Sequence, residues 1–97
     1  MKLEPNNAYL IAEEDEITIV NPKNGTDFKL EEIQKHVDGY IEVIRLSDVW
    51  IMIVNEEGKF SKGYNSIATA LAHLHHAIGS EDFIAGDAVI CPSTMLL

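Results

Sequence analysis

The first third of the chain consists of short apolar runs separated by polar turns. Residues 9–12 and 17–20 are apolar and partly β-branched, a pattern typical of two paired strands. A short amphipathic helix follows, since three apolar residues recur at i, i+3 and i+7: Leu30, Ile33 and Val37. Asp38-Gly39 then offers a left-handed end to this helix.

The middle of the chain is its most apolar part. Residues 40–46 and 49–54 predict two further strands, and the second run does not alternate with polar residues. A strand that is apolar on both faces needs cover on both. Because two short helices cannot easily cover both faces of the sheet, we expect a homo-oligomer that hides the rest.

The last third predicts a second helix and a final strand. Asn65 is the expected N-cap, and Gly79 the expected stop. Residues 87–91 read as a strand that Pro92 ends. The core stripe of the helix is predicted to consist of four residues within one narrow sector: Ile67, Leu71, Leu74 and Ile78.

These elements give the order ββαββαβ. We predict the α+β class, with a mixed or antiparallel sheet of about five strands and two helices. The 97 residues suit one domain over residues 1–97. Residues 1–7 are expected to be a loose N-terminal segment.

Composition narrows the functional classes. The net charge of −9 disfavours direct binding of nucleic acid or of an anionic membrane. No run approaches the roughly 20 apolar residues of a membrane span, and the first residues do not resemble a secretory signal, so we expect a cytoplasmic protein. The single Cys91 excludes an internal disulfide and a four-thiolate zinc site.

The only run of like charges is Glu13-Glu14-Asp15-Glu16. Four adjacent acids are usually a solvated turn between strands. The alternative is an acidic patch that imitates a phosphate backbone, together with Glu31 and Glu32.

Three histidines, His73, His75 and His76, invite a metal hypothesis. His73 and His76 are three residues apart and would share a helix face with Thr69, but two imidazoles do not complete a zinc site. We therefore expect no metal, and a face toward solvent, a ligand or another subunit. No nucleophile elbow or phosphate-binding glycine loop occurs, and Cys91 suits the core, so no catalytic residue or cofactor is expected.

The segment before the second helix is the candidate ligand site. A helix N-terminus attracts anions, and nearby lysines strengthen that field. The alternative is a polar strand exit and N-cap without a ligand. The candidate residues would hold phosphate (Lys59, Lys62 and Asn65), permit close approach (Gly63) or stack on a base (Tyr64 and Trp50), with Arg45 as a reserve cation and His73 and His76 as further ligand contacts.

Five blocks of the sequence resemble one known family: residues 28–34, 37–43, 55–59, 65–70 and 84–89. The chain is similar there to the domain of unknown function 3846 family, small proteins of phages, plasmids and other bacterial mobile elements. The resemblance covers roughly residues 17 to 91. It implies a setting in the bacterial host cytoplasm, where small phage proteins often counter host defence by binding.

Three functions follow as hypotheses. The first is a non-enzymatic binding protein that sequesters a nucleotide-derived defence signal, as a homo-oligomer without nucleic-acid or membrane partners. The second is an acidic inhibitor that occupies the nucleic-acid groove of a host protein. The third is a nucleotide-degrading enzyme with His73 or His76 as general base.

Overall fold

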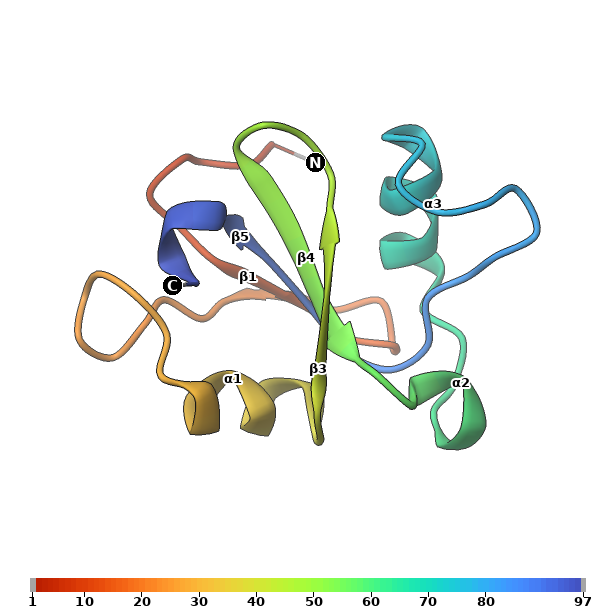
Figure 1. The fold of residues 1–97 in the computed structure, drawn as a ribbon, viewed down its shortest axis with the longest axis horizontal. Coiled ribbons are helices and arrows are strands. Elements are labelled where there is room, and N and C mark those ends of the chain that lie inside the picture. The colour runs from red at the N-terminus through yellow and green to blue at the C-terminus, as the bar shows by residue number, and fades with distance from the viewer. Residues whose placement is uncertain (1, 97) are drawn as a thin grey trace.

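The computed structural model describes residues 2–96 and has a five-stranded antiparallel sheet. The strand order is β2-β1-β5-β4-β3, with α1 and α3 on opposite sides of the sheet (Figure 1). The α+β prediction is confirmed. The elements are β1 (Tyr9–Ile11), β2 (Ile17–Ile19), α1 (Leu30–Val37), β3 (Ile41–Arg45), β4 (Trp50–Asn55), α2 (Gly58–Ser61), α3 (Ser66–Leu74), β5 (Ala88–Pro92) and the 3₁₀ helix η1 (Ser93–Met95).

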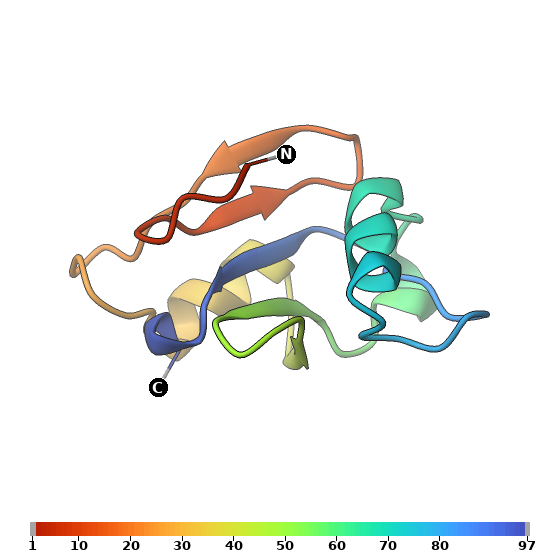
Figure 2. The ribbon, with the colours of Figure 1, turned by 90° about the horizontal axis from the view of Figure 1, so that it is seen from above.

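Two hairpins flank the central strand β5. The first joins β1 to β2 through residues 12–16, and the second joins β3 to β4. β5 pairs with β1 on one side and with β4 on the other. The last strand of the chain thus closes the sheet between the two hairpins (Figure 2).

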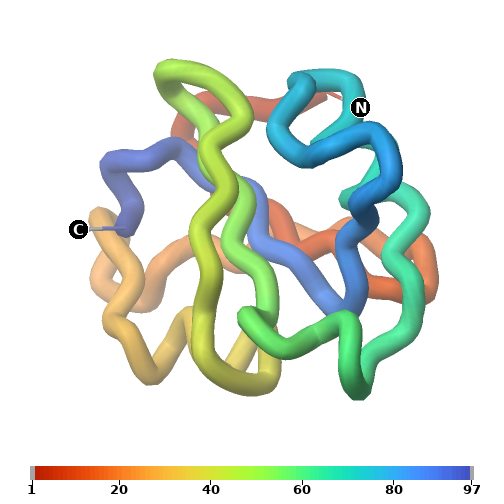
Figure 3. Tube along the Cα trace, turned by 45° about the vertical axis from the view of Figure 1, so that its right-hand side comes forward, coloured from red at the N-terminus to blue at the C-terminus, as the bar shows by residue number. Residues whose placement is uncertain are grey.

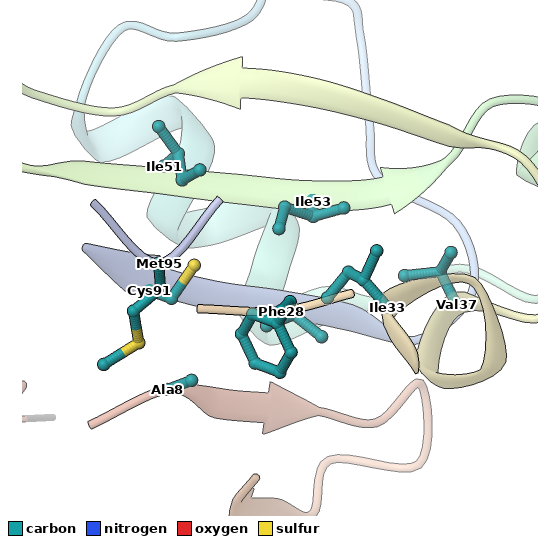
Figure 4. Packing of buried hydrophobic residues seen from close by; sticks show 9 residues of the cluster. Ala8, Phe28, Ile33, Val37, Ile51, Ile53, Cys91 and Met95 are labelled. Atoms are coloured by element: carbon teal, nitrogen blue, oxygen red, sulfur yellow. The ribbon is translucent and has the colours of Figure 1, made fainter. Parts of the chain in front are cut away.

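One face of the sheet packs against α1. Ile33 and Val37 of this helix are buried against Ile51 and Ile53 of β4 (Figure 4). Asp38 ends the helix in left-handed backbone with φ 59°, as the Asp38-Gly39 pair predicted. Phe28, Cys91 and Met95 complete this half of the core.

The opposite face packs against α3 through its small residues. Ala68, Thr69 and Ala72 are buried, whereas Leu74 is 72% exposed. The predicted core stripe of Ile67, Leu71, Leu74 and Ile78 is therefore wrong as a stripe. Ile67 and Leu71 are only partly buried and Ile78 lies beyond the helix. Small residues face the sheet because they let the helix approach it closely, and the larger side chains then point to the flank and to solvent.

The end of α3 also differs from the prediction. The helix ends at Leu74, and His76 takes the left-handed conformation with φ 53°. Gly79 is thus not the stop. The backbone N–H of Ala77 bonds to Ala72 O, which closes the helix with the pattern usually supplied by glycine.

The chain covers the central strands by itself. Ile51, Met52, Ile53 and Val54 of β4 are all buried, although they point alternately to the two faces. The requirement for a second copy to cover this strand was therefore wrong, because α1 lies on one face and α3 with Ile84 on the other. Homo-oligomerisation itself stays a prediction. No helix within residues 2–96 is long and apolar enough to cross a membrane.

Candidate functional site

The segment between β4 and α3 was the candidate anion site, and its Lys62 lies among acidic side chains. Lys62 is 25% exposed and forms an ion pair with Asp38. Its stem lies against Gly86, where an added Cβ would be 3.1 Å from Lys62 Cγ. Glu13 and Asp87 add to the negative field around it. The hydrogen bond and charge of Asp38 raise the pKa of Lys62, and Lys62 in turn lowers the pKa of Asp38.

A pocket of about 350 Å³ surrounds this ion pair. We call it the acidic pocket, and it is lined by Ala12, Glu13, Glu14, His36, Val37, Asp38, Lys62 and Asp87. Four carboxylates thus face one lysine. Such a pocket attracts cations and repels phosphate.

The β1–β2 turn forms the rim of the acidic pocket. Glu14, Asp15 and Glu16 are exposed, as expected for a solvated turn. The N–H of Glu13 donates to Asp87 Oδ1 at 3.0 Å, which ties this turn to the start of β5. We call residues 13–16 the acidic turn, and the acidic turn and acidic pocket together the acidic end.

Gly63 does allow a close approach, but by a residue of the protein. A Cβ at this position would lie 2.9 Å from Glu13 Oε1. The approach that sequence reasoning assigned to a phosphate is therefore made by a carboxylate.

The N-terminus of α3 is closed by internal partners. Figure 3 shows the chain of the β1–β2 turn beside the start of this helix. Asn65 is fully buried, and its Oδ1 accepts the Ala68 N–H at 3.0 Å, as the N-cap prediction required. Its Nδ2 donates to Ile11 O and to Gly86 O at 2.9 and 2.8 Å. Ser66 Oγ donates to Asp15 Oδ1 at 2.7 Å, so a carboxylate already lies beside this helix end. Asn65 is a structural residue in this arrangement.

Lys59 and Tyr64 meet at a different place, around Asp82 and Phe83. Lys59 pairs with Asp82 and lies 5.3 Å from the centre of the Phe83 ring. The rings of Tyr64 and Phe83 have centroids 5.7 Å apart. The Lys59 hydrogen bond, helped by the Phe83 N–H, lowers the pKa of Asp82. A groove of about 490 Å³ runs beside this cluster, lined in part by Lys59, Phe60 and Phe83.

Trp50 and Arg45 lie at the other end of the sheet. They flank the β3–β4 turn, and Arg45 Nη1 donates to Ser47 O at 3.2 Å. Since β4 has six residues, Trp50 is roughly 17 Å along the strand from Asn55, whose Nδ2 donates to Asp38 O at the acidic end. The two residues therefore do not join the candidate site.

The histidines do not form one face. His73 is in α3 and His76 lies beyond its end, so the expectation of a shared helix face was wrong. His73 Nε2 lies 2.8 Å from Asp82 O, and because a carbonyl only accepts, Nε2 carries the proton. Among the described residues, no three histidine, cysteine or acidic side chains are placed to hold a metal ion.

Asp38, Asp82, Phe83 and Asp87 were missed from the sequence. Asp38 was predicted only as a turn residue, and it does end α1. Asp87 was predicted only as the start of a strand, whereas β5 begins one residue later, at Ala88. Their position beside lysines depends on contacts between distant segments. Glu31 and Glu32 also differ from expectation, since Glu32 accepts the Lys23 and Lys29 N–H groups at the start of α1, away from the acidic turn.

Fold and site together define a small antiparallel α+β protein with an acidic pocket at one end of its sheet. The chain belongs to the domain of unknown function family DUF3846, whose model matches residues 5–94. No curated protein and no solved structure matches the chain.

Proposed function

We propose that this protein is a non-enzymatic, acidic binding protein whose acidic end occupies a basic, nucleic-acid-binding surface of another protein. The observation that carries the proposal is the ion pairing of both candidate phosphate-binding cations. Lys59 is held by Asp82 and Lys62 by Asp38, so the positive charge of this region is already neutralised by the protein itself.

The placement of the remaining carboxylates supports the same function. The acidic turn projects Glu14, Asp15 and Glu16 into solvent beside the acidic pocket. A row of exposed carboxylates on a rigid hairpin can take the place of successive phosphates in a basic groove. The hairpin is held by the Glu13 and Ser66 hydrogen bonds, so little ordering entropy is lost when it binds.

The setting of this function is also a proposal. We place the protein among the accessory proteins of phages or mobile elements, acting in the cytoplasm of a bacterial host. Its partner would be a host defence or DNA-binding protein with a cationic groove.

The test is binding of a fluorescent, lysine-rich peptide, measured by anisotropy at about 50 and about 500 mM salt. We expect binding that weakens steeply at the higher salt, because the contacts are solvent-exposed charges. The double variant Glu14→Lys, Glu16→Lys should weaken binding at low salt at least about tenfold.

The matched control reverses two exposed carboxylates elsewhere, Glu31→Lys and Asp48→Lys. It makes the same change in net charge outside the residues that line the acidic pocket. Equal loss of binding in both double variants would show that only the net charge of the protein matters, and would refute the proposed site.

Sequestration of a nucleotide-derived signal is the second candidate. The groove beside Lys59 favours it, since Phe60 and Phe83 offer rings for a base and Lys59 a charge for phosphate. Native mass spectrometry of protein from infected cells should then detect a bound nucleotide. Its intact recovery after heat denaturation distinguishes sequestration from cleavage, and absence of any co-purifying small molecule would count against this candidate.

A further inference from the structure

β2 is an edge strand that leaves part of its backbone unpaired. It pairs with β1 on one side and has no neighbouring strand on the other within residues 2–96. The Ala12 N–H bonds to Glu16 O at 2.8 Å, and the Val20 N–H bonds to Ala8 O at 2.9 Å. Because the direction of these groups alternates along a strand, Ile17 and Ile19 direct their N–H and C=O groups outward.

The side chains of the same two residues form an uncovered apolar pair. Ile17 lies opposite Ile11 and Ile19 opposite Tyr9, so both project from the side of the sheet on which α3 packs. They are 38% and 59% exposed. No charged side chain interrupts the strand, whose sequence Ile17-Thr18-Ile19 reads the same in both directions.

We propose that β2 pairs antiparallel with β2 of a second copy of this chain, about a twofold axis at Thr18. In this register each Ile17 faces an Ile19 of the other copy. The outward N–H and C=O groups of these residues then satisfy one another, and all four isoleucines meet on one side of the joined sheet. The strand is self-complementary, which is what a twofold interface between identical copies requires.

The charges near β2 favour this antiparallel arrangement. The acidic turn precedes β2 and Lys23 follows it. An antiparallel pair places the acidic turn of one copy toward the Lys23 end of the other, whereas a parallel pair would place the two acidic turns together. No residue of β2 lines the acidic pocket. The interface is measured by cross-linking and solution mass, and the proposed function by peptide binding, so the two can fail independently.

Cross-linking tests the register. In Thr18→Cys the two introduced thiols face each other at a non-hydrogen-bonded pair, a spacing that suits a disulfide. We expect rapid formation of a covalent dimer under mild oxidation. Cys91 does not compete, because it is buried and its burial raises its pKa to about 12.

Val43→Cys is the matched control, at an exposed position of the other edge strand, β3. We expect it to cross-link at least about tenfold more slowly. Equal rates for the two variants would overturn the proposed interface.

Solution mass gives an independent readout that requires no cross-link. Light scattering should give the dimer mass for the wild-type chain and for Val43→Lys, and the monomer mass for Ile19→Lys at the same concentration. A wild-type monomer at several hundred micromolar, or an Ile19→Lys dimer, would overturn the proposal. If β2 instead pairs with a different protein, the purified wild-type chain would have the monomer mass, and this result would also overturn the proposal.

Discussion

Asn65 joins three separate parts of the chain through one amide group. It caps α3 through Ala68 and holds the carbonyls of Ile11 and Gly86. The sequence predicted the cap because an asparagine precedes a helical pattern. The other two bonds connect positions 54 and 21 residues away, and no local pattern signals them.

Replacing Asn65 by alanine should therefore cost more than the loss of a cap. Two buried carbonyls and one buried N–H lose their partner at once, so we expect a loss of about 3 kcal/mol or more in the free energy of unfolding. Urea denaturation measures it. Asn6→Ala, at an exposed asparagine, is the control and should change stability by less than about 0.5 kcal/mol.

Cys91 is predicted to be unreactive in the folded protein. It is fully buried in β5, and desolvation raises the pKa of its thiol to about 12. A thiol reagent at pH 8 should modify it only after unfolding, since the thiolate is the nucleophile. Complete modification within minutes under native conditions would contradict this burial.

At the scale of elements, the sequence predicted the strands and α1 well and α3 only in part. α1 has one polar and one apolar face, so its periodicity identified Ile33 and Val37 as buried. Leu30, the first residue of the same predicted pattern, is 56% exposed. In α3 apolar residues lie on nearly every side. Periodicity then selects the largest side chains, whereas close packing on the sheet selects Ala68 and Ala72.

Two substitutions in α3 test which side faces the core. Leu74→Ala should change the free energy of unfolding by less than about 0.5 kcal/mol, because Leu74 is already exposed. Ala72→Leu should destabilise by about 1–3 kcal/mol, because the added atoms have no space against the sheet. A large loss in the free energy of unfolding for Leu74→Ala, together with no change for Ala72→Leu, would show that Leu74 faces the core, as the sequence predicted.

For the whole molecule, the acidic end was predictable as charge but not as geometry. The acidic turn is visible in the sequence as four adjacent acids. The sequence also predicted that Lys59 and Lys62 are free to bind phosphate, because their partners Asp82 and Asp38 are more than 20 residues away along the chain. Because both lysines are paired with carboxylates, the predicted anion site is instead an acidic one.

The lysine pairs imply a pH dependence of stability. The pKa values of Asp38 and Asp82 are lowered below the ordinary 3.8 by their lysines, so their contribution is complete above about pH 5 and is lost as pH falls through the lowered values. The pKa of Lys62 is raised above 10.5, so its contribution is complete below that value and is lost as pH rises through the raised one. Both effects are small because all three side chains are at least partly exposed to solvent.

Urea midpoints between pH 2 and 7 measure the acid limb. The urea midpoint of Asp82→Asn should fall less steeply with decreasing pH than that of the wild type, because the variant lacks one of the two carboxyl groups whose pKa is lowered. Identical slopes would show that the Lys59–Asp82 pair contributes nothing.

The most direct test of the central claim is to locate the bound partner on the surface. A ¹⁵N-labelled sample titrated with the lysine-rich peptide should show its largest amide shifts in the acidic turn and at Asp38, Lys62 and Asp87. Shifts confined to the groove around Lys59, Phe60 and Phe83, or spread evenly over the surface, would contradict the assignment of binding to the acidic end.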